Sequence, residues 1–276
     1  MHLEEVGKDI TISEIKDKGS KISLLFDNGE KAKVYRATYI EFNLNPGVTL
    51  NQEAIKEINS FDEKEEIIEY LKSLIAKRPY NEAELLKKCI SKFKNYNNVS
   101  KAISELKSYH LIDDQDYIEN YMDYFDRNNY GKYFIINFFK NNGLKEELIE
   151  KLEFCDENEL KKARNYFDSI KNKYVSGNFA KQKKKIYDLM LRRGFSIENI
   201  LEVLNDLKIN QTAELERLKK DYRKVKMKYF VTNDSGVDAN SKIISKLINK
   251  GYNLEDINTI IEEDNDFGEA EEILND

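Results

Sequence analysis

Residues 186–203 read IYDLMLRRGFSIENILEV, and the same pattern returns at 135–152 and at 243–260. In each segment apolar residues at helical spacing precede a glycine, one apolar residue follows it, and a second amphipathic stretch begins. Glycine readily adopts the left-handed conformation that ends a helix, so each segment predicts a helix, a glycine turn and a second helix. The matching positions hold Ile135, Ile186 and Ile243, then Phe139, Met190 and Leu247, then Gly143, Gly194 and Gly251, then Ile149, Ile200 and Ile257.

Longer amphipathic stretches at 117–127, 157–174 and 213–229 lie between these helix pairs, so each repeat is predicted to contain three helices. A divergent copy spans 84–106, where residues 93–98 form a longer loop in place of the glycine turn. Because such units bury their apolar faces mainly against their neighbours, tandem repeats predict an elongated, curved array.

The first sixty residues differ from the rest. Residues 10–36 alternate as strands do, and Asp27-Asn28-Gly29 is a strong hairpin signal. A short helix is expected at 36–43, and Asp62 is expected to cap the first helix of the repeats. We therefore predict a mainly α protein with a small N-terminal β-containing domain. The predicted divisions are 1–61 for that domain, then 62–114, 115–155, 156–208 and 209–276 for four helical repeats, the last with an acidic tail.

The composition agrees with this class. The 276 residues are 35% charged and 40% hydrophobic, and they include only two prolines, which favours helices over a turn-rich sandwich or barrel. The two cysteines have no CxxC spacing, which argues against a disulfide framework or a zinc site. No apolar stretch approaches the length of a membrane span. We expect a cytoplasmic monomer without a membrane segment.

The motifs of several enzyme classes are absent. No two glycines lie closer than ten positions, which excludes the GxGxxG fingerprint, the P-loop and the GxSxG elbow. His2 and His110 are the only histidines, so two-histidine metal sites are excluded as well. His110 is expected to end a helix, Asp113 and Asp114 to cap one, and Cys89 to be a packed thiol. We expect no catalytic residue, cofactor or metal, and hence no enzyme.

The net charge of −6 hides a strong segregation. Residues 171–250 carry 19 basic and 9 acidic side chains, whereas residues 251–276 carry ten acids and no base. This asymmetry indicates either a polyanionic partner or an acidic interaction tail, although charged residues that merely solvate helix faces would give the same composition. The head groups of Lys185 and Arg193 are expected to stay in solvent while their stems pack. The candidate partner-binding residues are Lys183, Lys184, Arg192, Arg193, Lys242, Lys246 and Lys250, followed by Arg78 and Lys132 in the first two repeats, with Lys87 and Lys88 nearby.

Four segments together resemble the RecX family of bacterial recombinase regulators. They are Lys77-Arg78-Pro79-Tyr80-Asn81-Glu82-Ala83-Glu84-Leu85, Leu111-Ile112-Asp113-Asp114-Gln115-Asp116-Tyr117, Gly131-Lys132…Ile135…Phe139…Gly143, and Leu191-Arg192-Arg193-Gly194-Phe195. The resemblance covers nearly the whole chain. The sequence departs from the family at Asn81, where Ser is common, and in the missing glycine of the first repeat; Asn caps a helix equally well.

The resemblance implies a non-enzymatic modulator that lies along the groove of the RecA filament and limits strand exchange, ATPase and co-protease activities, with roles in DNA repair, homologous recombination and the SOS response. It also implies single- or double-stranded DNA as a further partner, and it makes Leu111, Tyr117, Gly143 and Gly194 fold determinants rather than contacts. One alternative is a sequence-independent DNA-binding protein of tandem helix-turn-helix-like repeats. A purely structural scaffold is another.

Overall fold

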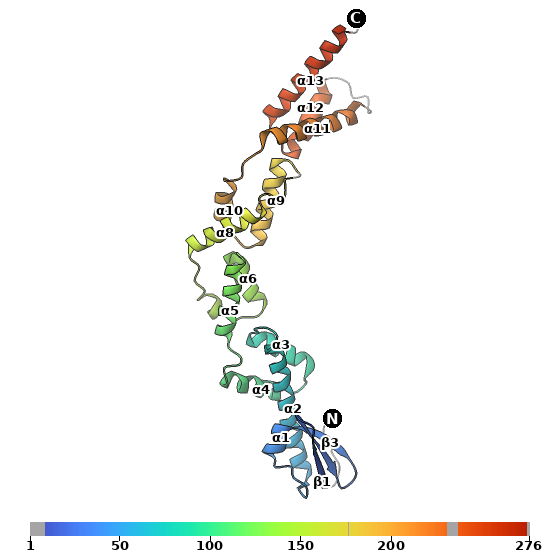
Figure 1. The fold of residues 1–276 in the computed structure, drawn as a ribbon, viewed down its shortest axis with the longest axis vertical. Helices are drawn as coiled ribbons and strands as arrows, with labels where there is room; N and C mark the ends of the chain where they lie inside the picture. The colour runs from blue at the N-terminus through green and yellow to red at the C-terminus, as the bar shows by residue number, and fades with distance from the viewer. Residues whose placement is uncertain (1–8, 176, 231–236, 275–276) are drawn as a thin grey trace. The chain divides into compact units, whose positions relative to one another are not determined.

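The computed structural model describes residues 9–175, 177–230 and 237–274, and it divides the protein into two compact units. Unit 1 takes in the chain as far as Tyr124 together with Phe138–Lys151. Unit 2 takes in Phe125–Asn137 and the chain from Leu152 onward. Figure 1 labels the helices and strands of both units.

Unit 1 begins with an antiparallel sheet in the order β3-β2-β1-β4. The sequence alternates along β2, so that Ile22, Leu24 and Phe26 are buried while their neighbours are more exposed. The predicted hairpin joins β2 to β3, and Gly29 takes a positive φ of 85° in its turn. The strands are β1 (Ile10–Asp17), β2 (Lys21–Phe26), β3 (Lys31–Tyr35) and β4 (Thr49–Leu50).

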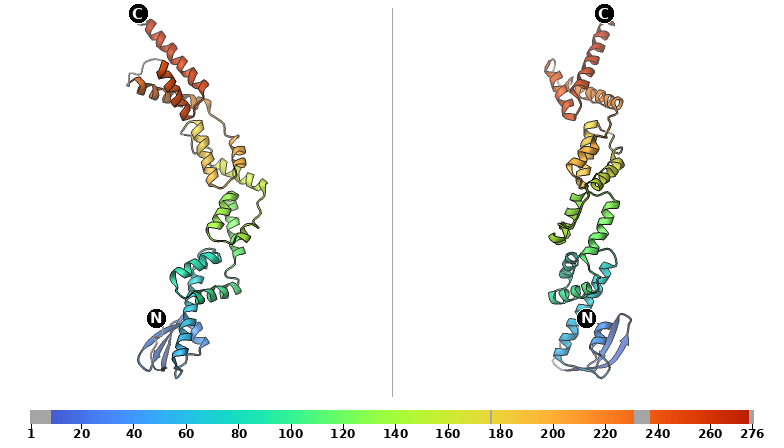
Figure 2. Two further views of the ribbon diagram at one scale, coloured as in Figure 1. Left: turned by 180° about the vertical axis from the view of Figure 1, so that it is seen from behind. Right: turned by 90° about the vertical axis from the view of Figure 1, so that its left-hand side faces the viewer.

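Helix α1 (Arg36–Glu41) follows the sheet as predicted, and α2 (Gln52–Ile75) packs Ile55 and Ile58 into the core of the sheet. Helix α2 then continues into the first repeat without a break (Figure 2). The prediction that Asp62 caps a new helix is therefore wrong. Its carboxylate instead accepts hydrogen bonds from the backbone of Tyr35 at 2.6 Å and the hydroxyl of Thr38 at 2.7 Å, which ties the helix to the end of the sheet.

The C-terminal half of α2 forms repeat 1 with α3 (Glu82–Lys92) and α4 (Tyr96–Ser108). Its core includes Leu71, Leu85 and Leu106. His110 ends α4 as expected, with a positive φ of 54°. Repeat 2 consists of α5 (Asp114–Arg127), α6 (Lys132–Asn141) and α7 (Glu146–Ile149).

Unit 2 holds the third and fourth repeats, each with its own apolar core. Repeat 3 consists of α8 (Asp156–Ile170), α9 (Phe179–Arg192) and α10 (Ile197–Leu204). Repeat 4 consists of α11 (Gln211–Phe230), α12 (Val237–Lys250) and α13 (Leu254–Leu274). The mainly helical class, the small β-containing domain and the three-helix repeats are confirmed. The acidic side chains from residue 265 onward lie outside the described side chains.

The three glycines that mark the repeats end their helices with positive φ, at 78° for Gly143, 89° for Gly194 and 99° for Gly251. Gly194 is also crowded, because a Cβ at this position would overlap the backbone of Phe134. The glycine is thus required both for its conformation and for the close approach of the preceding repeat.

Candidate partner-binding surface

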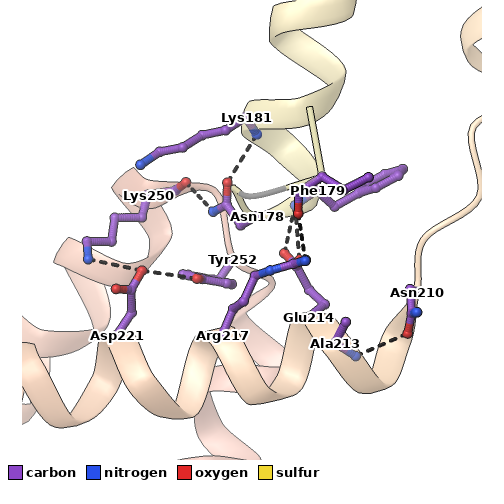
Figure 3. A network of polar contacts seen from close by, with 11 residues as sticks. Asn178, Phe179, Lys181, Asn210, Ala213, Glu214, Arg217, Asp221, Lys250 and Tyr252 are labelled. Atoms are coloured by element: carbon purple, nitrogen blue, oxygen red, sulfur yellow. Dashed lines mark hydrogen bonds and ion pairs between the residues drawn. The ribbon is translucent and has the colours of Figure 1, made fainter. Parts of the chain in front are cut away.

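Consecutive repeats meet through a recurring set of contacts, which we call the repeat junction. Between repeats 3 and 4, the Asn178 side-chain oxygen caps α9 by accepting from Lys181 N at 3.1 Å (Figure 3). Its Nδ2 donates to the Lys250 carbonyl at 2.6 Å, next to Gly251. The Glu214 carboxylate accepts from the first helical N–H, that of Phe179, at 3.0 Å. Residues of repeat 4 thus accept or complete hydrogen bonds that the N-terminus of α9 in repeat 3 would otherwise leave unpaired.

The junction between repeats 1 and 2 is built in the same way. Asn81 caps α3 through Glu84 N at 2.7 Å, and its Nδ2 donates to the Asn142 carbonyl at 3.1 Å, next to Gly143. The Asp114 carboxylate accepts from the Glu82 N–H at 2.9 Å. A carboxylate at a helix N-terminus also interacts favourably with the helix dipole.

Between repeats 2 and 3, a glycine replaces the capping asparagine. Gly131 N donates to the Arg193 carbonyl at 3.0 Å, and the buried Glu159 carboxylate accepts from Lys132 N at 2.8 Å. A Cβ on Gly131 would overlap the Gly194 carbonyl. All three junctions therefore use a helix start, an acidic side chain and the carbonyl before a glycine.

Several predicted partner-binding residues take part in this internal framework. The Arg78 guanidinium lies 3.6 Å from the Tyr80 ring centroid and bonds Glu84 at 2.7 Å, a bond that raises the pKa of Arg78 above its ordinary value. The Lys250 ammonium pairs with Asp221 at 3.1 Å. Lys132 is half-buried, with its ammonium 5.4 Å from the Tyr133 ring centroid.

The expectation that the Arg193 head group stays in solvent is wrong. Its guanidinium lies 3.5 Å from the Tyr130 ring centroid and 4.9 Å from that of Tyr166, and it donates to the carbonyls of Asn128 and Asn129. A planar guanidinium can stack and donate at once, which a lysine head group cannot do in the same way. Arg193 is thus a packing residue of the junction between repeats 2 and 3.

The remaining candidates on α9 are exposed. Lys183, Lys184 and Arg192 lie at the surface, away from the buried side chains of Ile186 and Met190. The neighbouring Lys185 is exposed too, as predicted, with its ammonium 5.9 Å from the Tyr174 ring centroid. The predicted residues of α9 are therefore exposed on the same helix, although the nine-residue spacing places Lys183 and Arg192 on opposite sides of it. Lys242 and Lys246 on α12 each already interact with other groups of the chain.

Helix α11 carries a basic stripe that the sequence reasoning missed. Lys220, Arg223 and Lys224 are exposed, follow the i, i+3, i+4 spacing of one helix face, and form no hydrogen bond or ion pair with the residues that the structure describes. Two other lysines of α11 instead pair with α13, Lys219 with Glu263 at 2.8 Å and Lys226 with Asp264. The helical spacing within 220–224 was the available signal.

Two aspartates hold repeat 4 together. Burial alone would raise the pKa of Asp221, but hydrogen bonds from Lys250 and Tyr252 outweigh it and keep that pKa below its ordinary value. Burial alone would likewise raise the pKa of Asp264. The hydrogen bonds from Lys226 and Tyr222 outweigh this effect and keep the pKa below its ordinary value. Both carboxylates are therefore stabilised in the charged form.

The described residues contain no group of three or more His, Cys, Asp or Glu side chains that could hold a metal ion. The Cys89 thiol is buried, and burial raises its pKa to about 11, which suits a packed thiol rather than a nucleophile. Within the same described part of the chain, no helix is both long enough and apolar enough to span a membrane.

Comparison with known proteins gives a consistent set of relatives, although no family model matches the chain. Regulatory protein RecX of Streptococcus agalactiae serotype Ia is 26% identical over 265 residues, which cover 91% of this chain and 98% of that protein. Regulatory protein RecX of Staphylococcus saprophyticus is 23% identical over 277 residues, which cover 96% and 98%.

A crystal structure of regulatory protein RecX matches the fold with a TM-score of 0.57 and 20% identity, over 71% of this chain and 99% of that one. The sequence relatives extend over almost their full length, and this solved structure has the same fold. The four segments noted in the sequence, the three glycine turns and these relatives agree, and the chain is similar over almost its whole length to regulatory proteins named RecX.

Proposed function

We propose that this protein binds the RecA recombinase filament in the cytoplasm and restrains strand exchange, ATPase and co-protease activities, without catalysing a reaction itself. The related proteins are named as regulatory proteins, which supports a regulatory role. In this proposal the protein acts as a monomer that contacts the assembled filament along several repeats. Many weak contacts along a repeat protein add up to strong overall binding.

The observation that carries the proposal is the exposed basic surface of α9. Lys183, Lys184 and Arg192 are exposed and have no part in the apolar core or in the repeat junctions, so their charges are available to a partner. Such a surface attracts acidic protein or the phosphates of filament-bound DNA, and the attraction weakens over a Debye length of about 8 Å at physiological ionic strength.

The experiment measures the ATPase and strand-exchange activities of RecA on single-stranded DNA with increasing amounts of this protein. The wild type is expected to inhibit both. The triple variant Lys183→Glu, Lys184→Glu and Arg192→Glu is expected to inhibit less while unfolding at the same temperature. A matched control reverses Lys31 and Lys33, two exposed lysines of β3, and should inhibit like the wild type. Full inhibition by the triple variant would reject α9 as the contact surface.

A second candidate function is direct, sequence-independent binding to the DNA backbone, and the stripe on α11 favours it. Three exposed cations on one helix face can contact successive phosphates. Without RecA, the anisotropy of labelled single-stranded DNA should then rise on mixing, with an affinity that falls steeply between about 50 and 200 mM salt. Reversal of Lys220, Arg223 and Lys224 to Glu should abolish that signal.

A further inference from the structure

Exposed apolar residues recur at two fixed positions of the repeats. One position lies three residues before the turn that ends the middle helix, and the other is the first residue of the last helix. In repeat 3 these are Leu191 and Ile197, which are 47% and 52% exposed. In repeat 4 they are Ile248 and Leu254, which are 45% and 48% exposed.

Repeat 1 has the same pair although it lacks the glycine. Its helix α3 is in register with α6, because Leu85 and Cys89 are buried four and eight residues after Asn81, as Ile135 and Phe139 are after Gly131. In this register, Ile90 and the first residue of α4, Tyr96, occupy the two positions, and they are 39% and 65% exposed.

Repeat 2 reveals how the two positions are related. It carries Lys140 and Glu146 there, and their side chains form an ion pair at 3.6 Å across the glycine turn. In repeat 2 the two positions therefore face each other, and repeats 3 and 4 have the same glycine turn, so we expect an apolar residue at both positions to make one continuous patch. We call Ile90 with Tyr96, Leu191 with Ile197, and Ile248 with Leu254 the apolar pairs.

The cores of the repeats do not account for these pairs. The residue before each first member, such as Met190, and the residue three after each second member, such as Ile200, are completely buried. These neighbours supply the apolar contacts on which helix packing depends. A single exposed apolar residue is ordinary on a protein surface, but the same two positions in three of four repeats need a different reason.

We propose that each apolar pair docks into an equivalent apolar site on a successive subunit of one protein polymer. This inference rests on the proposed function, under which the polymer is the RecA filament. The pairs point to a polymer because equivalent apolar positions recur from repeat to repeat, and they suit a partner whose sites also recur.

The charges beside the pairs specify the partner further. Lys87 lies three residues before Ile90, and Lys184 and Arg192 lie seven residues before and one after Leu191; all three are exposed. In repeats 1 and 3, the basic side chains beside the first member of the pair are complementary to acidic side chains at the edge of an apolar protein site, whereas the acidic Glu198 and Glu255 follow the second members Ile197 and Leu254. Bare phosphate backbone offers no apolar surface to receive an apolar pair. The partner surface is therefore protein.

The test measures the affinity of the full chain for RecA filaments assembled on single-stranded DNA. Three double variants remove one pair each: Ile90→Ser with Tyr96→Ser, Leu191→Ser with Ile197→Ser, and Ile248→Ser with Leu254→Ser. Each is expected to weaken binding by about tenfold or more, since two large apolar side chains lose their contacts. The control variants Met227→Ser and Ile40→Ser change residues that are 70% and 67% exposed but lie outside the pairs, and they should bind like the wild type.

A gain of affinity provides the opposite test. Lys140→Leu with Glu146→Leu gives repeat 2 the missing pair and should tighten binding. Circular dichroism checks each fold, and the single variant Ile197→Ser, at a helix start that tolerates serine, serves where a double variant does not fold. If the wild type binds but the pair variants bind equally well, the apolar pairs are rejected and the proposed function stands. If the wild type does not bind the filament, both are rejected.

Discussion

The side-chain amide of Asn178 donates a hydrogen bond to the main-chain carbonyl of Lys250, which lies 72 residues further along the chain (Figure 3). The same side chain caps α9, so one residue both begins a helix and joins it to the next repeat. Asn81 does the same with Asn142, 61 residues later. Because the two asparagines are buried, their polar groups need these partners.

Replacing Asn178 with Ala is expected to destabilise the protein by about 2 to 4 kcal/mol, because a helix cap is lost and the part-buried carbonyl of Lys250 loses its donor. Chemical unfolding followed by circular dichroism measures the change. Asn51→Ala is the matched control, since Asn51 caps α2 through Ala54 N at 2.9 Å but is exposed. It should cost only about 1 kcal/mol. Equal losses at the two positions would contradict the bridging role of Asn178.

A comparison of Gly194 with Gly47 distinguishes the effect of steric crowding on stability from the effect of backbone conformation. Their φ values are almost equal, 89° and 88°, but a Cβ on Gly194 would overlap Phe134 whereas a Cβ on Gly47 would meet nothing within 4 Å. Replacement of Gly47 with Ala should cost about 1 kcal/mol for the left-handed conformation alone. Gly194→Ala should lower the free energy of unfolding by at least about 2 kcal/mol more than Gly47→Ala does, and Gly194→Val should lower it further. Similar thermal unfolding of Gly194→Ala and Gly47→Ala would show that the junction is not tightly packed.

Arg192 and Arg193 are adjacent in the sequence, but reversing their charges should have different effects on the stability of the protein. Arg193→Glu removes the stacking on Tyr130 and the bonds to the carbonyls of Asn128 and Asn129, so we expect a loss of about 2 kcal/mol or more. Arg192→Glu changes an exposed side chain and should stay within about 0.5 kcal/mol of the wild type. Urea unfolding distinguishes them, and a strong effect of Arg192→Glu would overturn the division between surface and framework.

Repeat 4 should become less stable in acid. The pKa values of Asp221 and Asp264 are lower in the folded protein than their ordinary values, so their contribution is fully present above the unfolded pKa of about 4 and is lost as the pH falls through the folded values. Thermal unfolding between about pH 2 and 7 measures this. Asp221→Asn with Asp264→Asn should reduce stability at pH 7 and flatten the pH dependence below 4. An unchanged pH profile would contradict the two lysine–tyrosine networks.

The sequence predicts the glycine-marked repeats and the hairpin well, because each depends on local chemistry. Positive φ lets glycine end a helix at positions 143, 194 and 251, and it lets Gly29 form the hairpin turn; neither depends on distant residues. The junctions could not be predicted in this way. Asn178 looks like an ordinary cap, and Arg193 looks like a surface cation, until partners 72 and 65 residues away are known.

The sequence also does not predict that α2 continues through Asp62 without a break. Asp62 has the residue type of a cap, but its partners, Tyr35 and Thr38, come from β3 and α1 rather than from its own helix. The lysines of α9 are exposed, in agreement with the prediction, whereas a charge count over residues 171–250 does not distinguish the stripe on α11 from the rest of the basic region. Their role in binding stays a prediction.

The most direct test of the account is co-sedimentation of the purified protein with RecA filaments assembled on single-stranded DNA with a non-hydrolysable ATP analogue. Parallel samples contain the DNA alone or RecA alone. We predict that the protein sediments with the assembled filament and that it neither binds the DNA alone at physiological salt nor binds unassembled RecA comparably. Equal binding to DNA without RecA would contradict the filament account and favour the DNA-binding function, and no binding to the filament would reject the account entirely.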